Sequence, residues 1–276
     1  MARQCKRQAW PPSEVQRCGD PVLLDDQGLV QSRPALGNGY GAKHAQTCWP
    51  GLAGARLQTV SRRQKHLSVT IGTQPTTKGL HLLVDSIGIK MLGEGEWQTK
   101  KHGADYRRQW RKVHLGIDAA TLEIRAIEVT DNVTGDAPML SCLLDQIPAD
   151  EIVASVSGDG AYDTKGCHEA IAQLVAQAIN PTRNNAKPWK VQRPGAQARN
   201  AILAATRRLG RKIWKKWSGF HRRSLVETRM RCFKLLGERV MARDFYRQVA
   251  QLQVRVAILN RFTRLGTPTT VVVTMP

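Results

Sequence analysis

The stretch "LLVDSIGIK", residues 82–90, places one carboxylate in the middle of an apolar segment. If the stretch is a strand, Asp85 points to the same side as Leu83 and Ile87. A carboxylate on an apolar face is costly unless it is paired, hydrogen-bonded or bound to a metal. Asp85 is therefore either an acceptor of structural backbone hydrogen bonds or a functional residue.

Strand patterns recur beyond the predicted strand at residues 82–91. Residues 112–118, "KVHLGID", alternate apolar and polar side chains, and a second strand over residues 122–129 follows the turn "DAAT", so the two predict a hairpin. Residues 152–157 predict an apolar strand that runs into "GDGAYDT", and residues 178–180 open a short strand.

Helical patterns lie between and after these strands. Helices are expected over residues 164–177 and 222–236, and one begins within residues 135–147, with Asp136 as its cap and Pro138 in its first turn. In the last predicted helix, apolar residues fall at helical spacing over four turns: Phe245, Val249, Leu252, Val256 and Leu259. This order of strands and helices predicts an α/β fold, a mixed sheet flanked by helices.

The domain organisation is uneven. Residues 1–57 are an irregular, Gly- and Pro-rich segment without helical or strand period, which indicates a loose arm or a truncated or frameshifted remainder. Residues 58–79 predict a short basic helix and a linker. The main domain is expected over residues 80–265, with a polar insertion near residues 182–219, and residues 266–276 form a tail.

The charge balance points to a polyanionic partner. The chain has 42 Lys and Arg against 22 Asp and Glu, a net charge of +20. Such a protein most often binds nucleic acid. We find no apolar stretch of spanning length and no signal-peptide pattern, so we expect no membrane partner and a cytoplasmic location. The cysteines are scattered without a C-x-x-C pair, which does not favour a zinc site.

Two further carboxylates stand out beside Asp85. Asp159 follows the strand at residues 152–157 between two glycines, where ligands approach a sheet closely, although a plain turn aspartate also fits. Glu227 lies in "GFHRRSLVETRMRCFKLLG". At ~100° per residue, a helix would place four residues within roughly 40° of one line: Phe220, Arg223, Glu227 and Lys234. A solvated Arg–Glu pair is the plain alternative.

Taken together, the three carboxylates predict a metal site. Side chains on two strands and one helix can converge on one point, and Mg²⁺ prefers such oxygen ligands. Two ions about 4 Å apart activate an attacking oxygen and stabilise a leaving one in phosphoryl displacement. We therefore predict Asp85, Asp159 and Glu227 as catalytic metal ligands for Mg²⁺ or Mn²⁺, without a small-molecule cofactor.

Several blocks resemble bacterial insertion-sequence transposases of the DDE type. These blocks are "HLLVDSIGIK", "GEGEWQTKKHGADYRRQWRKVHLGID", "DNVTGDAPML", "SGDGAYDT", "GFHRRSLVETRMRCFKLLG" and "MARDFYRQVAQLQVRVAILNRF". The resemblance implies a ribonuclease-H-like fold, Mg²⁺, and cleavage and rejoining of DNA at the ends of the insertion sequence. It matches the family's carboxylates to Asp85, Asp159 and Glu227. Its Y-R-E-K signature falls on the line of residues found by helical spacing, and implies that the flanking residues bind DNA phosphates.

The sequence departs from the family pattern in places. Phe220 stands where the signature has Tyr, so a hydroxyl is absent while an aromatic ring remains. Ile87 replaces the usual Thr, and "VSGDG" replaces the commoner "VTADG". Residues 1–57 do not resemble the N-terminal helical domain that recognises the terminal repeats in the family. No metal ligand is lost by these changes.

Basic runs with interleaved aromatic residues predict the DNA surface. They lie in residues 107–114 and 207–223, although Trp214 and Trp217 can instead be core residues. The expected DNA-binding residues, in addition to the signature residues Phe220, Arg223 and Lys234, are Trp110, Arg111, Lys112 and Arg222. The expected partners are DNA and, on DNA, further copies of the chain.

Three functions remain open. The first is a transposase that cleaves and transfers strands, which the intact carboxylates favour. The second is a catalytically inactive DNA-binding remnant that inhibits transposition, which the irregular residues 1–57 favour. A structure-selective nuclease of the same fold is the third, and the signature helix argues against it.

Overall fold

The computed structural model describes residues 62–67, 69–76, 79–91 and 110–266. The chain divides into two units, residues 1–67 and 68–276. In the first unit, residues 62–65 are helical, within the segment where a short basic helix was expected. The irregular segment predicted for residues 1–57 and the tail beyond residue 266 lie outside the described residues.

The second unit is built on one mixed sheet. Its strands are β1 (Leu80–Met91), β2 (Trp110–Asp118), β3 (Ile124–Thr130), β4 (Val153–Ser157), β5 (Gln177–Ile179) and β6 (Arg239–Val240). Among the described residues the strand order is β3-β2-β1-β4-β5, and β6 also pairs with β1. β2 is antiparallel to β1 and β3, whereas β4 runs parallel to β1 and β5. The predicted mixed sheet is confirmed and is consistent with a ribonuclease-H-like fold.

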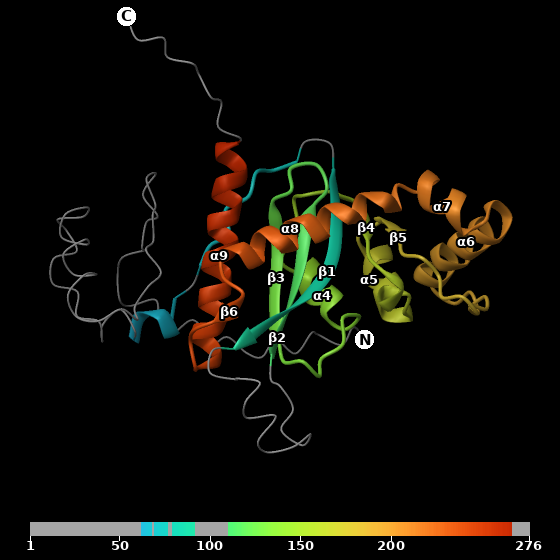
Figure 1. Ribbon diagram of the computed structural model, residues 1–276. Coiled ribbons are helices and arrows are strands. Elements are labelled where there is room, and N and C mark those ends of the chain that lie inside the picture. Colours follow the sequence, from blue (N-terminus) through green and yellow to red (C-terminus); the bar gives the residue numbers. More distant parts are fainter. Residues whose placement is uncertain (1–61, 68, 77–78, 92–109, 267–276) are drawn as a thin grey trace, which may run out of the picture. The chain divides into compact units, whose positions relative to one another are not determined.

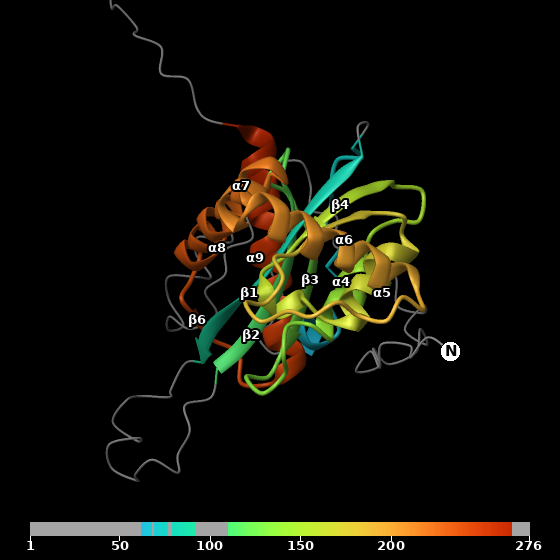
Figure 2. The same ribbon diagram turned by 90° about the vertical axis from the view of Figure 1, so that its right-hand side faces the viewer.

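Helices cover both faces of this sheet. The described helices are α4 (Met139–Leu144), α5 (Lys165–Gln173), α6 (Pro194–Leu209), α7 (Arg211–Trp217), α8 (Ser224–Leu235) and α9 (Phe245–Leu265), with 3₁₀ turns η2 (Gly160–Tyr162) and η3 (Phe220–Arg223). α8 and α9 lie on one side of the sheet, and α4 and α5 lie on the other (Figures 1 and 2).

Alternation along β1 divides its side chains between these two faces. Leu83 and Ile87 pack with the α8 and α9 cluster, whereas Leu82 and Val84 pack with the α4 and α5 cluster. Burying each large aliphatic side chain contributes about 1.5–3 kcal/mol, so the two clusters fix the register of β1. Asp85 therefore faces α8 and α9, as its period along the strand predicts.

Two helix boundaries differ from the sequence prediction. α8 begins at Ser224 because Phe220–Arg223 form the 3₁₀ turn η3, so the expected helix from residue 222 is shorter. α4 begins at Met139 with Pro138 in the cap position and without a side-chain cap hydrogen bond. Asp136 is not the cap: its carboxylate forms an ion pair with Lys112, and its Oδ1 lies 3.3 Å from Nδ1 of His114.

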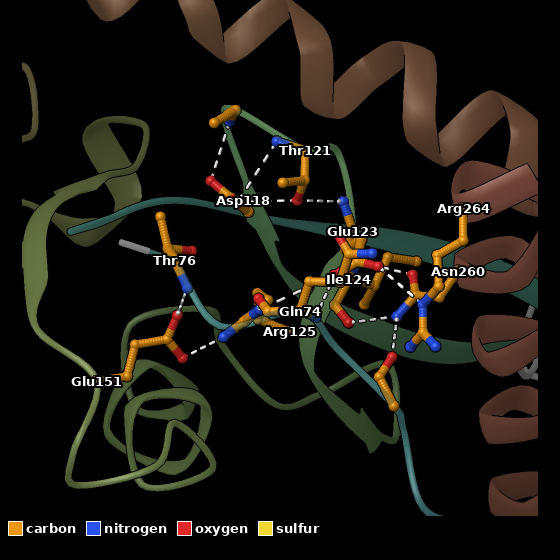
Figure 3. A network of polar contacts seen from close by, with 12 residues as sticks. Gln74, Thr76, Asp118, Thr121, Glu123, Ile124, Arg125, Glu151, Asn260 and Arg264 are labelled. Atoms are coloured by element: carbon orange, nitrogen blue, oxygen red, sulfur yellow. Dashed lines mark hydrogen bonds and ion pairs between the residues drawn. The ribbon is translucent and has the colours of Figure 1, made fainter. Parts of the chain in front are cut away.

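Buried charges attach the linker before β1 to the sheet (Figure 3). Arg125 of β3 donates hydrogen bonds to the carbonyl of Gln74 and to the carboxylate of Glu151. Glu123, which is 1% exposed, accepts hydrogen bonds from the backbone N–H of Gln74 at 2.8 Å and from Nε of Arg264 in α9 at 3.1 Å. Since each charge has a partner, the linker and α9 are fixed to the same end of the sheet.

A second buried cluster attaches α6 to α5, within the region predicted as an insertion. Nε of Arg199 lies 3.1 Å from Oδ1 of Asp163, and Nε2 of His168 lies 3.2 Å from the same oxygen. The Arg199 guanidinium also lies 4.3 Å from the ring centroid of Trp189. A Cβ on Gly195 would lie 2.6 Å from the backbone of Glu169, so this close helix contact requires glycine.

Candidate active site

Parallel pairing of β1 with β4 brings Asp85 and Asp159 together. The last paired residues are Leu83 and Ser157, and each aspartate follows two positions later on its own chain segment. Asp159 caps the turn η2, where its Oδ1 accepts a hydrogen bond from the backbone N–H of Ala161 at 2.8 Å. Asp85 and Asp159, which are far apart in the sequence, thus lie together where the pairing of β1 with β4 ends.

A single arginine joins the two carboxylates. Nη2 of Arg223 lies 2.5 Å from Oδ2 of Asp85 and 3.8 Å from Oδ2 of Asp159. The other oxygen of Asp85, Oδ1, accepts a hydrogen bond from the backbone N–H of Ser86 at 2.9 Å. One cationic nitrogen therefore occupies the position that both aspartates share.

Burial sets the electrostatics of this pair. Desolvation raises the pKa of Asp85 above its usual range, and the nearby carboxylates of Asp159 and Asp136 raise it further. The backbone N–H of Ser86 and the Arg223 guanidinium act in the opposite direction. Clustered, half-buried negative charge of this kind favours the binding of a cation.

The third predicted ligand, Glu227, does not form a three-residue ligand group with this pair in the described part of the chain. It is exposed on α8, one helical turn after Arg223, and lines an open pocket of about 440 Å³. The other lining residues are Lys212, Lys215, Lys216, Phe220, His221, Arg223 and Ser224. Within the part of the chain that the structure describes, no three His, Cys, Asp or Glu side chains are close enough to hold a metal ion together.

Comparison with known protein families identifies the family of this chain. Residues 76–261 match a family model described as a transposase DDE domain, and residues 48–94 match a second model with the same description. The first match covers more than half of the chain. The chain belongs to the DDE transposase family. Among the described helices of this transposase, none combines the length and hydropathy needed to cross a bilayer.

The signature residues of this DDE transposase do not form one helical stripe. Phe220 and Arg223 belong to η3, so the helical spacing used to align them with Glu227 applies only from α8 onward. Phe220 and Arg223 still line the same pocket as Glu227. Lys234 is exposed near the end of α8 and does not line it.

Of the four predicted DNA-binding residues outside the signature, Arg111 and Lys112 on β2 contact other parts of the transposase. Trp110 is 41% exposed. Nε of Arg111 donates a hydrogen bond to Gln248 at 2.7 Å, and its guanidinium lies 4.9 Å from the ring centroid of Phe245. Nζ of Lys112 lies 2.9 Å from Oδ1 of Asp136. Arg222 is exposed beside the pocket-lining residue Arg223. A role in DNA binding stays a prediction for all four.

One residue near the aspartates, Tyr162, was not predicted from the sequence. Tyr162 is 1% exposed, and its hydroxyl has no hydrogen-bond partner among the residues that the structure describes. Burial raises the pKa of the Tyr162 hydroxyl, and the negative charges of Asp136, Asp85 and Asp159 raise it further. The hydroxyl therefore lies close enough to these carboxylates to feel their charge. Tyr162 follows Asp159 by three residues in "GDGAYD", which was the available signal.

The site fits the divalent cation that DDE transposases imply. Hard cations prefer carboxylate oxygens, and Oδ2 of both aspartates already shares one cationic neighbour. The unpartnered hydroxyl of Tyr162 adds a polar group in the same field. Asp85 and Asp159 stay the predicted ligands of this ion.

Proposed function

We propose that this transposase cleaves DNA strands and transfers them at the ends of an insertion sequence, with Mg²⁺ or Mn²⁺ as cofactor. The observation that carries the proposal is the approach of one Arg223 nitrogen to Oδ2 of both Asp85 and Asp159. When bound, two divalent ions would activate the attacking oxygen and stabilise the leaving oxygen.

Each aspartate is oriented by the fold for this role. Oδ1 of Asp85 is held by the backbone N–H of Ser86, and Oδ1 of Asp159 is held by the backbone N–H of Ala161. These bonds direct the remaining oxygens toward the shared position and limit the rotation of both carboxylates. Glu227 would complete the ligand set from α8.

Basic residues beside the aspartates would bind the DNA backbone. Lys212, Lys215 and Lys216 line the pocket next to Arg223, and Nζ of Lys215 lies 5.1 Å from the ring centroid of Phe220. Contacts of this kind bind phosphates of any sequence and position the strand without selecting bases. DNA is the proposed substrate, with self-association on the DNA ends.

The test is nicking of a labelled, end-containing duplex with Mg²⁺, measured beside DNA binding on the same preparation. Glu227→Gln keeps the shape of the side chain and removes the charge, so nicking should be lost while DNA affinity stays equal or rises. Glu238→Gln is the control, since Glu238 is exposed just beyond α8. Equal nicking by wild type and Glu227→Gln would remove Glu227 from the catalytic set.

One observation favours the inactive remnant as a second candidate. Glu227 is exposed and, among the described residues, no three-ligand group is assembled. A remnant would bind DNA without nicking it under any metal condition. Nicking by the wild-type protein excludes this candidate.

A further inference from the structure

Arg223 occupies the position that a metal would need. Its Nη2 contacts Oδ2 of Asp85 and lies 3.8 Å from Oδ2 of Asp159, and these two oxygens are the ones not held by backbone N–H groups. A cation that binds both oxygens would have to replace this nitrogen. Positive charges also repel each other, so the guanidinium and a divalent ion cannot share the site without cost.

Arg223 is the cation that lies near both carboxylates, Asp85 and Asp159. Asp136 also raises the pKa of Asp85, but it has its own cationic partner. Nζ of Lys112 lies 2.9 Å from Oδ1 of Asp136. Asp85 and Asp159 together carry two negative charges, whereas Arg223 supplies one positive charge. A divalent ion would balance the pair fully, so it competes favourably for the position.

The contacts of Arg223 also allow it to leave. Its side chain is 20% exposed, and its Nε has no hydrogen-bond partner among the described residues. The residue lies in η3 and lines the pocket beside Lys212, Lys215 and Lys216. A change of side-chain rotamer would move the guanidinium from the aspartates into this basic pocket, where a phosphate would accept it.

We infer that Arg223 is a built-in cation which a divalent metal displaces from Asp85 and Asp159, and that the displaced guanidinium then binds a DNA phosphate. Metal and DNA consequently bind with positive coupling, each raising the affinity for the other by the same factor. This inference rests on the metal site of the proposed function. It gives Arg223 a second role besides DNA binding: it keeps the aspartates paired until metal and DNA are both present.

The experiment is calorimetric titration of the full chain with Mn²⁺, with and without a short duplex. For the wild type, the duplex should raise Mn²⁺ affinity by roughly 5- to 150-fold, the usual range of coupling between sites. Arg223→Gln should raise Mn²⁺ affinity without DNA by about tenfold or more and bring the coupling factor close to one. Arg231→Gln, at an exposed position on α8, removes the same charge and should change neither quantity.

The outcomes separate the two proposals. If Mn²⁺ binds in an Asp85-dependent manner, as shown by its loss in Asp85→Asn, but Arg223→Gln binds it no more tightly, the displacement is wrong and the metal site stands. If no variant binds Mn²⁺ through Asp85, the metal site fails and the displacement fails with it.

Folding of the variant gives a second measurement. Without its cation, Arg223→Gln leaves two like charges together, so its melting temperature without metal should fall and Mn²⁺ should raise it more than in the wild type. If the variant is unfolded without metal, Mn²⁺ or the added change Asp85→Asn should restore folding. Restoration by neither would overturn the inference.

Discussion

Each aspartate of the site uses one oxygen for the fold and offers the other to a cation. Backbone N–H groups of Ser86 and Ala161 hold the Oδ1 atoms, while both Oδ2 atoms face Arg223. The direction of Asp85 follows from the two-residue period of β1 and was predictable from the sequence. The partner of Asp85 was not, because it depends on η3, whose 3₁₀ turn has no strong sequence signal.

His114 is a second residue whose environment the sequence did not reveal. Its alternation in "KVHLGID" indicated the polar side of a half-buried strand, yet the imidazole is 0% exposed. Nδ1 lies 3.3 Å from Oδ1 of Asp136, and Nε2 lies 3.0 Å from Oγ1 of Thr130. Helices on the other face of the sheet bury it, which strand periodicity alone does not predict.

Protonation of His114 should make folding stability depend on pH. Burial lowers the pKa of His114 to about 4, against 6.5 in an open chain. Below pH 6.5 the unfolded chain takes up a proton that the folded chain does not, so stability falls until about pH 4. His114→Gln should lose this contribution, of at most about 1.4 kcal/mol per pH unit.

The measurement is urea unfolding between pH 7 and pH 4, in wild type and in His114→Gln. The exposed His221 provides the control, since His221→Gln should follow the wild-type profile. Parallel profiles for wild type and His114→Gln would show that His114 is not a buried neutral imidazole.

At the scale of elements, α7 divides its two tryptophans between core and surface. Trp214 is 2% exposed and lies 6.3 Å from the ring centroid of Phe220, whereas Trp217 is 69% exposed. From the sequence, each tryptophan could be either a core or a surface residue, because a short helix with mixed basic and aromatic residues has no clear apolar face. In the structure, Trp214 is the buried one, beside Phe220 of η3.

The two tryptophans should therefore separate stability from binding. Trp214→Ala should cost about 3–5 kcal/mol of unfolding free energy through the cavity it leaves. Trp217→Ala should change stability by less than about 0.5 kcal/mol, yet weaken binding of a single-stranded oligonucleotide by about 1–3 kcal/mol through lost stacking. Denaturant titration and fluorescence anisotropy on both variants check this. Unchanged affinity in Trp217→Ala would exclude a stacking role.

For the whole molecule, the sheet topology explains how the predicted ligands Asp85 and Asp159 come together although they lie far apart in the sequence. β1 pairs in parallel with β4, so Asp85 on β1 and Asp159 just after β4 lie near each other. The mixed sheet, its strands other than β6, and its last helix were predictable from periodicity. The position of Glu227 was not, because it depends on how α8 follows the α6–α7 segment and η3.

The central claim is that Asp85 is a metal ligand in DNA cleavage. The most direct measurement is nicking by Asp85→Cys in Mg²⁺ and in Mn²⁺, with Asp145→Cys at an exposed position as control. Mg²⁺ requires oxygen ligands, whereas transition-metal ions accept sulfur more readily. The account predicts that wild type and Asp145→Cys nick with either ion, and that Asp85→Cys is inactive in Mg²⁺ and partly active in Mn²⁺. Nicking by Asp85→Cys in Mg²⁺ at the wild-type rate, or no nicking by wild type with either ion, would contradict it.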